Sequence, residues 1–245
     1  MKEIHSAARD GYIGLVKSLL GRDPKKVNDK DEGWTPLHFA SREGQMEMVR
    51  LLIEHGADVN AQIDTYQNYS GTTSLHLAAA YGHKSVVELL LANGADINRR
   101  DGEGNTALHR ALGIKTCDDV VELLITSGAD VNARNEAGET PLHTAVDWCH
   151  IKSTDLLLEK RVDVNVKDTR GITPLYMASV FSVAQAVGDE LAQLVTNLIS
   201  NGADVNARTL TDYGGIPAGT TPLGGALHKN RARVAELLKQ HGGVV

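Results

Sequence analysis

The chain has 245 residues, of which 25 are lysine or arginine and 31 are aspartate or glutamate, so its formal net charge is −6 at pH 7. This acidic balance argues against a nucleic-acid binder, because neutralising phosphates requires a basic surface. No apolar run approaches the ~20 residues that a membrane-spanning helix needs, and the polar opening segment MKEIHSAARD does not resemble a secretory leader.

A short signature recurs along the chain and predicts an internal repeat. It reads TPLH, TSLH, TALH, TPLH, TPLY and TPLG, beginning at Thr35, Thr73, Thr106, Thr140, Thr173 and Thr221. The spacings are 38, 33, 34, 33 and 48 residues. Self-similarity at a period of roughly 20 to 50 residues is typical of proteins that stack short structural units.

Each signature also predicts the beginning of a helix. A threonine oxygen accepts a hydrogen bond from the first free amides of a helix, and a proline at the first helical position gives up no bond. Four copies have this pair, at 35–36, 140–141, 173–174 and 221–222. These four sites are therefore predicted helix starts.

The copy that opens at Thr73 shows how one unit is built. Its first helix is predicted to have an apolar face formed by Leu75, Ala78 and Ala79. After a break at Gly82, a second helix is predicted to have an apolar stripe formed by Val86, Val87, Leu90 and Leu91. Gly94 ends this helix, because glycine readily adopts the left-handed conformation at such stops.

A period of 33 residues with a TPLHxA signature resembles the ankyrin repeat. The resemblance covers essentially the whole chain. It implies an all-α solenoid of seven helix pairs, including caps, joined by β-hairpin-like fingers.

We expect a single domain, 1–245, in which terminal caps close a stack of repeats. The predicted cap is 1–32, the repeats are 33–70, 71–103, 104–137, 138–170 and 171–218, and the C-terminal cap is 219–245. Each repeat buries its apolar face only against its neighbours, so both ends need polar outer surfaces. The two caps favour a complete, self-standing solenoid.

The repeats depart from their own pattern at several places. Insertions lengthen the chain at 61–70, 180–190 and 207–219, and Arg161 replaces the glycine that ends the other second helices. A non-glycine residue in a left-handed conformation costs about 1 kcal/mol. The insertions have two interpretations: neutral drift, since loop-closure entropy grows slowly with length, or binding features.

The sequence predicts no catalytic residue, no metal site and no cofactor. The resemblance implies that the histidines of the signature, His38, His76, His109 and His143, hydrogen-bond backbone between repeats. The other histidines form no HExxH and have no CxxC companion. A cysteine nucleophile needs a base and a third group that orients the base, and Cys149 has His150 beside it, but neighbouring side chains in a turn usually diverge. We interpret Cys117 and Cys149 as free thiols, since stacked helices lie too far apart for an easy disulfide.

The resemblance implies a partner-binding surface on the concave face, made of finger tips and exposed positions of the first helices. The candidate contact residues are Trp34, Arg42, Tyr66, Tyr69, Tyr81, Ile114, Trp148, Arg170, Phe181 and Tyr213. Aromatic side chains among charged neighbours are typical of interface hot spots. The alternative is that Trp148 and Phe181 pack under the long segment of the repeat 171–218.

We therefore expect a monomeric, non-enzymatic module that binds another protein. The excess of acidic over basic residues in 33–220 favours a basic or polar partner. Two alternatives stay open: a small-molecule or enzymatic site in the repeat 171–218, with Asp189, Glu190 and Asp212 as its polar groups, and a structural or regulatory spacer in a larger assembly. We expect a cytoplasmic protein without membrane contact. The style of the caps resembles bacterial stand-alone ankyrin proteins, so secretion as an effector without a leader stays open, as does a nuclear location.

Overall fold

The computed structural model describes residues 2–64, 69–113, 118–180, 189–212 and 215–245. These residues form two compact units, Met1–Asp130 and Val131–Val245. The described residues hold fourteen α-helices in seven pairs and no β-strand, with one isolated bridge between Asp31 and Trp34. The predicted all-α class and helix pairing are confirmed, whereas the β-hairpin-like conformation of the fingers is not. The division into caps and repeats of one domain stays a prediction.

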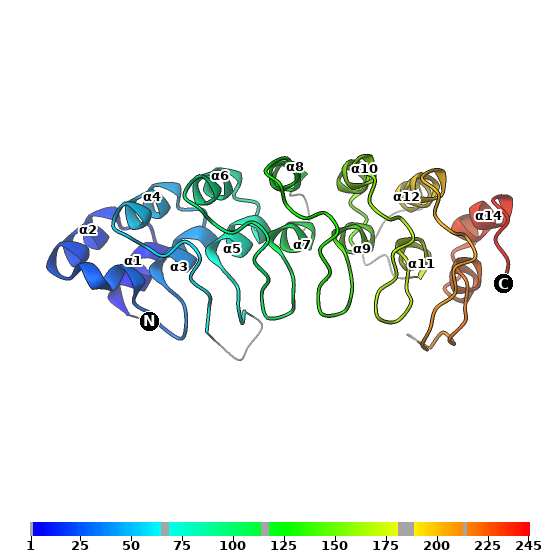
Figure 1. Ribbon diagram of the computed structural model, residues 1–245, viewed down its shortest axis with the longest axis horizontal. Helices are drawn as coiled ribbons and strands as arrows, with labels where there is room; N and C mark the ends of the chain where they lie inside the picture. Colours follow the sequence, from blue (N-terminus) through cyan, green and yellow to red (C-terminus); the bar gives the residue numbers. More distant parts are fainter. Residues whose placement is uncertain (1, 65–68, 114–117, 181–188, 213–214) are drawn as a thin grey trace. The chain divides into compact units, whose positions relative to one another are not determined.

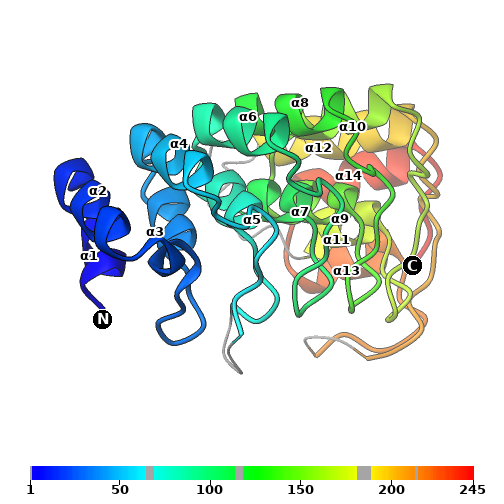
Figure 2. The ribbon, with the colours of Figure 1, turned by 60° about the vertical axis from the view of Figure 1, so that its left-hand side comes forward.

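Helices of the N-terminal unit form two rows (Figure 1). The first helices of its repeats are α1 (Glu3–Arg9), α3 (Pro36–Arg42), α5 (Ser74–Ala80) and α7 (Ala107–Leu112). The second helices are α2 (Ile13–Arg22), α4 (Met46–Glu54), α6 (Lys84–Ala92) and α8 (Asp118–Thr126), and a 3₁₀ helix, η1, covers Pro24–Asn28. Each first helix packs against the next first helix, and the loops before α3, α5 and α7 project to one side of the unit (Figure 2).

The C-terminal unit repeats this arrangement within itself. Its first helices are α9 (Pro141–Asp147), α11 (Pro174–Val180) and α13 (Pro222–His228). Its second helices are α10 (Ile151–Glu159), α12 (Asp189–Ser200) and α14 (Ala232–Gln240). The four predicted Thr-Pro starts are confirmed, because α3, α9, α11 and α13 all begin at the proline.

The apolar faces that the sequence predicts lie in the core. In the pair α5–α6, the buried side chains include those of Leu75, Ala78, Ala79, Val86, Val87 and Leu90. Leu91 is only half-buried, at the edge of the stripe. Burial of alanine at the first-helix interface lets neighbouring backbones approach closely, so short helices of about two turns still bury a continuous core.

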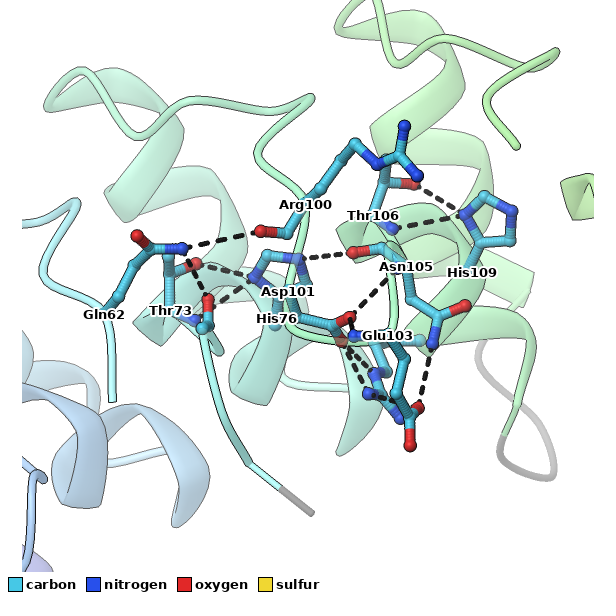
Figure 3. A network of polar contacts seen from close by, with 11 residues as sticks. Gln62, Thr73, His76, Arg100, Asp101, Glu103, Asn105, Thr106 and His109 are labelled. Carbon is cyan, nitrogen blue, oxygen red and sulfur yellow. Dashed lines mark hydrogen bonds and ion pairs between the residues drawn. The ribbon is translucent and has the colours of Figure 1, made fainter. Parts of the chain in front are cut away.

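Signature histidines join each repeat to the next. His38 Nδ1 accepts a hydrogen bond from the Thr35 backbone N–H at 3.0 Å, and its Nε2 donates to the Ala61 carbonyl at 3.0 Å. His76 makes the same contacts with Thr73, at 3.2 Å, and with the Asn105 carbonyl, at 3.0 Å (Figure 3). The two bonds fix the neutral ring with its proton on Nε2.

The same bridge recurs in the C-terminal unit, where His143 accepts from the Thr140 N–H at 3.2 Å and donates to the Ile172 carbonyl at 3.0 Å. The inter-repeat role that the resemblance implied for these histidines is thus observed for His38, His76 and His143. His109 likewise accepts from the Thr106 N–H, at 3.2 Å. Tyr176 stands at the histidine position of α11, where its side chain is buried.

A recurring asparagine forms a second clamp between repeats. Asn60 Nδ2 donates to the Gly94 carbonyl at 3.0 Å, and its Oδ1 accepts from the Asp96 N–H at 2.8 Å. The same pair of bonds joins Asn165 to Gly202 and Asp204. The recurring GAD-x-N sequence is therefore explained: the glycine end of one second helix is held by the asparagine of the preceding repeat.

Three non-glycine residues of the C-terminal unit have a positive φ at positions where other repeats have glycine. Arg161 has φ 55°, as predicted, and Cys149 and Asn230 both have φ 56° at the place where Gly44 and Gly82 separate the helices of their repeats. Asparagine tolerates this conformation better than other non-glycine residues, so the backbone strain is greatest at Arg161 and Cys149.

Acid should weaken the fold through the buried histidines. Burial lowers the pKa of His38 from 6.5 to about 4, and it also lowers the pKa values of His76 and His143. A folded-state pKa below the unfolded value gives stability that is present above pH 6.5 and lost as the pH falls toward about 4. His38 alone contributes about 3 kcal/mol to this loss.

We expect the urea midpoint of His38→Gln to change less than that of the unmodified chain between about pH 7 and about pH 5. His55→Gln is the matched control, because the His55 side chain is exposed after the end of α4. An equally steep pH dependence in His38→Gln would contradict the assignment of a buried, neutral ring.

Replacing Arg161 by glycine should stabilise the chain by about 0.5–1 kcal/mol, because glycine adopts a positive φ without steric cost. Lys160→Gly is the control, since Lys160 has φ −79° at the end of α10 and gains nothing from glycine. Chemical unfolding of both variants measures the difference. A loss of stability in Arg161→Gly would show that contacts of the arginine side chain outweigh the strain.

Candidate partner-binding surface

Four predicted contact residues of the N-terminal unit lie together and form what we call the aromatic–arginine cluster: Trp34, Arg42, Tyr69 and Tyr81. Trp34 precedes Thr35, the N-cap of α3, and Arg42 is the last residue of that helix, whereas Tyr81 is the C-cap of α5. Tyr69 belongs to the lengthened finger at 61–70. The cluster therefore draws on two successive repeats and on one of the predicted insertions.

Trp34 is the centre of the aromatic part of the cluster. Its ring centroid lies 5.0 Å from that of Tyr69, edge to face, and 5.0 Å from that of Phe39. Phe39 is buried on α3, while Trp34 and Tyr69 are half-buried. Aromatic pairs at such distances contribute about 0.5–1.5 kcal/mol beyond the area they bury. The buried Phe39 ring thus supports two rings, those of Trp34 and Tyr69, that remain partly exposed to solvent.

Arg42 crosses from Trp34 to Tyr81. Its guanidinium carbon lies 6.0 Å from the Trp34 ring centroid and 5.5 Å from the Tyr81 ring centroid, and its Nε donates to the Tyr81 hydroxyl at 3.3 Å. That hydrogen bond raises the pKa of the guanidinium, which stays protonated. The Tyr81 residue is 42% exposed and the Arg42 side chain 37%, so both are accessible to a partner.

Contacts from the next repeat hold the end of α3 in place. His83 Nε2 donates to the Arg42 carbonyl at 2.8 Å, and its ring stacks on that of Tyr81 at 6.4 Å. This approach requires a glycine at position 44: a Cβ there would lie 2.5 Å from the His83 ring. His83 is not among the contact residues predicted from the sequence, where only its place directly after Gly82 indicated a role between repeats.

The tyrosine of the inserted finger is also fixed. The Ile63 N–H donates to the Thr72 carbonyl at 2.9 Å and the Thr72 N–H to the Tyr69 carbonyl at 3.0 Å, which closes the described ends of the finger. Partial burial and a hydrogen bond with Tyr81 raise the pKa of the Tyr69 phenol. The insertion thus brings an aromatic side chain to the preceding finger.

Two other arginines differ from Arg42 because each forms ion pairs with two carboxylates of the chain. Arg110 pairs with Asp101 at 2.5 Å and with Glu103 at 2.9 Å (Figure 3 shows both acids). Arg170, a predicted contact residue, pairs with Asp168 at 2.8 Å and with Glu139 at 3.0 Å. The side chains of Asp101 and Asp168 are fully buried, so these networks support the fingers. A direct partner contact of Arg170 stays a prediction.

In the C-terminal unit, Trp148 is the exposed aromatic side chain at the end of α9. It is the C-cap of that helix, as Tyr81 is of α5, and it is 39% exposed. Asp147 beside it is half-buried and accepts no hydrogen bond from any described residue. Desolvation by burial, followed by the charge of Glu139, raises the pKa of Asp147, while Arg170 lowers it.

The remaining predicted contact residues, Tyr66, Ile114, Phe181 and Tyr213, lie outside the described residues, as does Cys117. Cys149 is a free thiol, as predicted, and burial raises its pKa, which opposes the formation of a nucleophilic thiolate.

A groove of about 400 Å³ lies among the fingers of the N-terminal unit, lined by Asn28, Lys30, Thr35, Asp58, Asn60, Ala61, Gln62 and Asp64. Its polar groups pair with one another: Lys30 with Asp64, and Asn28 with the Asp58 N–H at 2.8 Å. The groove is therefore part of the clamp between repeats. Within the described parts of the chain, no group of three or more His, Cys, Asp or Glu residues is placed to hold a metal ion, and no helix is long and apolar enough to cross a membrane.

Comparison with protein families identifies the repeating helix pair. A family model described as ankyrin repeats (3 copies) matches residues 4–101, 67–135 and 99–168, and a single ankyrin repeat matches residues 170–210. The chain belongs to the ankyrin-repeat family. Ankyrin repeats are generally protein–protein interaction modules and are typically non-catalytic.

Curated relatives of this ankyrin-repeat chain match short segments. Palmitoyltransferase akr1 of Schizosaccharomyces pombe is 42% identical over 62 residues, which is 25% of this chain and 10% of the relative. Serine/threonine-protein kinase VIK of Arabidopsis thaliana is 44% identical over 62 residues, 25% of this chain and 14% of the kinase. The human BCL-6 corepressor-like protein 1 is 41% identical over 58 residues, 23% of this chain and 3% of that protein. The matched part of each relative is thus well below two thirds of its length.

Asp147→Asn should stabilise this ankyrin-repeat chain at neutral pH, because the folded carboxyl has a pKa above its unfolded value and its charge is poorly compensated. The penalty disappears as the pH falls and the carboxyl binds a proton, so the gain in melting temperature should shrink in acid. Asp155→Asn is the control, since Asp155 accepts a hydrogen bond from Asn197 at 2.7 Å. A melting temperature of Asp147→Asn below that of the unmodified chain at pH 7 would contradict the unpaired state.

Proposed function

We propose that the chain is a non-enzymatic module that binds another protein through its finger tips and the ends of its first helices. The aromatic–arginine cluster is the observation that carries the proposal. Trp34, Tyr69 and Tyr81 are amphipathic or half-exposed aromatics of the kind that dominate interface energetics, and they surround an arginine. Trp148 contributes a second exposed aromatic in the C-terminal unit.

Rigidity supports this proposal. Side chains of the cluster are held by ring contacts at 5.0 Å, by the Arg42–Tyr81 hydrogen bond and by the His83 bond to the Arg42 carbonyl. A pre-organised surface loses little conformational entropy on binding. The clamps at His38 and His76 fix the repeats that carry these side chains.

Further proposals concern the oligomeric state, location and ligands of the module. We propose a monomer that acts in the cytoplasm, binds neither nucleic acid nor membranes, and uses no cofactor. The net charge of −6 supports the absence of nucleic-acid binding, because phosphates would be repelled. A location in the nucleus, or outside the producing cell as an effector, and a role as a spacer in a larger assembly are alternatives to this setting.

The small-molecule or enzymatic alternative in the repeat 171–218 gains no support from the described residues. Asp189 pairs with Arg233, and Asp212 accepts a hydrogen bond from the Ala218 N–H at 2.7 Å. Residues 181–188 of this repeat lie outside the described residues. Two of the three acidic side chains that the sequence suggested, Asp189 and Asp212, are thus engaged in local contacts, while Glu190 is exposed at the start of α12. The interaction module is the function that we propose.

Substituting both Trp34 and Tyr81 by alanine should reduce capture of a partner from a lysate of the native organism by at least about tenfold, since hot-spot residues each contribute roughly 2 kcal/mol or more. Quantitative mass spectrometry of the captured proteins measures the change. Tyr12→Ala is the matched control, because Tyr12 is 60% exposed but lies before α2, away from the cluster.

Trp148→Ala tests the C-terminal unit separately. A partner whose capture depends on Trp34 and Tyr81 alone would locate binding in the N-terminal unit. Capture that none of these substitutions changes, with melting temperatures equal to that of the unmodified chain, would contradict the proposed module.

A further inference from the structure

Arg42 has hydrogen-bonding capacity that the fold leaves unused. Its Nε donates to Tyr81, but among the described residues no acceptor lies within hydrogen-bond distance of its two terminal nitrogens. The nearest carboxylate, that of Glu43, lies 3.9 Å from Nε, which is too long for a hydrogen bond. Arg42 therefore presents two parallel N–H donors from a fixed position.

Comparison with Arg110 and Arg170 shows what such a group binds in this protein. Both arginines are met by a buried aspartate and by a glutamate, at 2.5 to 3.0 Å. Among the described residues, no equivalent carboxylate lies within hydrogen-bond distance of the Arg42 guanidinium. A planar guanidinium recognises a carboxylate through two N–H bonds, a geometry that a lysine cannot reproduce.

We infer that Arg42 anchors an acidic partner segment by binding one of its aspartate or glutamate carboxylates, while Trp34, Tyr69 and Tyr81 contact the apolar residues beside that acid. The inference rests on the proposed function and names the chemistry of its partner. The occupant is an unmodified acidic peptide segment with at least one apolar neighbour of the carboxylate.

The geometry around Arg42 favours this occupant over a basic one. The guanidinium lies over two aromatic rings, and guanidinium is more weakly hydrated than ammonium, so little hydration is lost when its edge binds an anion. A lysine or arginine of a partner would meet the positive edge of Arg42. The negative charge of the whole chain favours basic partners at long range, but it is screened beyond about 8 Å at physiological salt.

Glu43 modulates this anchor. Its exposed carboxylate at 3.9 Å partly compensates the charge of Arg42 without occupying the terminal nitrogens. An incoming carboxylate competes with this weak pair and forms shorter bonds. Removing the charge of Glu43 should therefore strengthen binding, whereas removing the fork of Arg42 should weaken it.

The test begins with selection of a random peptide library against the full chain. Enriched peptides should share an aspartate or glutamate beside an apolar residue. For the most enriched peptide, fluorescence anisotropy then measures the dissociation constant with the unmodified chain and with Arg42→Gln, Arg42→Lys, Glu43→Gln and Arg50→Gln. Arg50 is the matched control, since it is an exposed arginine of α4 whose nearest carboxylate, Glu47, also lies 3.9 Å away.

Arg42→Gln should weaken binding about tenfold or more, and replacing the acid of the peptide by its amide should weaken it by a similar factor. The two changes together should cost little more than either alone, which is the signature of a direct pair. Arg42→Lys should also lose most of the affinity, although it keeps the charge. Glu43→Gln should tighten binding, and Arg50→Gln should leave it unchanged.

Other outcomes separate this inference from the proposed function. Peptides without an enriched acid whose binding depends on Trp34 and Tyr81 would overturn the carboxylate anchor and leave the interaction module standing. Enrichment of basic residues, full affinity in Arg42→Lys, or tighter binding of a phosphoserine peptide than of the aspartate peptide would also overturn the inference. Peptides that bind independently of Trp34, Tyr81 and Arg42 would overturn both the inference and the assignment of the cluster as the binding surface.

Discussion

The hydrogen-bonded, neutral histidine of the repeat signature is the interaction on which the other features depend. One imidazole caps the start of its own helix through Nδ1 and reaches the backbone of the next repeat through Nε2, as His38 does with Thr35 and Ala61. A single imidazole ring therefore fixes both the start of its own helix and the position of the next repeat. Since buried polar groups must find partners, this ring permits essentially one spacing between successive first helices.

This fixed spacing explains why side chains from different repeats form a surface. Arg42 ends α3 and Tyr81 caps α5, so a guanidinium of one repeat reaches the ring of the next. Gly44 admits the His83 ring, which in turn holds the Arg42 carbonyl. The surface is thus built from the contacts that stack the repeats. Cys149 has the positive φ of Gly44 at the equivalent position, but its side chain makes that conformation strained.

Periodicity allowed the helix pairs, the Thr-Pro starts and the positive φ of Arg161 to be predicted, because each follows from residues close together in the sequence. The partner-binding surface was predictable only as a set of candidates. The resemblance implied exposed positions for Trp34, Arg42 and Tyr81, but it did not distinguish Arg42, which has unused donors, from Arg170, which is engaged by Asp168 and Glu139. That distinction depends on which carboxylates the fingers place beside each arginine. The conformation of an insertion such as 61–70 also cannot be predicted from the repeat pattern, because the other repeats lack it.

The net charge of the chain and the charge of the aromatic–arginine cluster have opposite signs. The chain carries −6 overall, and the half-buried Asp147 beside Trp148 adds a poorly compensated negative group in the C-terminal unit. In the aromatic–arginine cluster, by contrast, the accessible charge at hydrogen-bond distance is positive, because the neighbouring acid Glu43 remains 3.9 Å from Nε. Association rates follow the long-range field, whereas the identity of the bound group follows the contacts. Net charge therefore sets how fast a partner arrives, and the unpaired edge of one arginine sets which side chain of that partner is held.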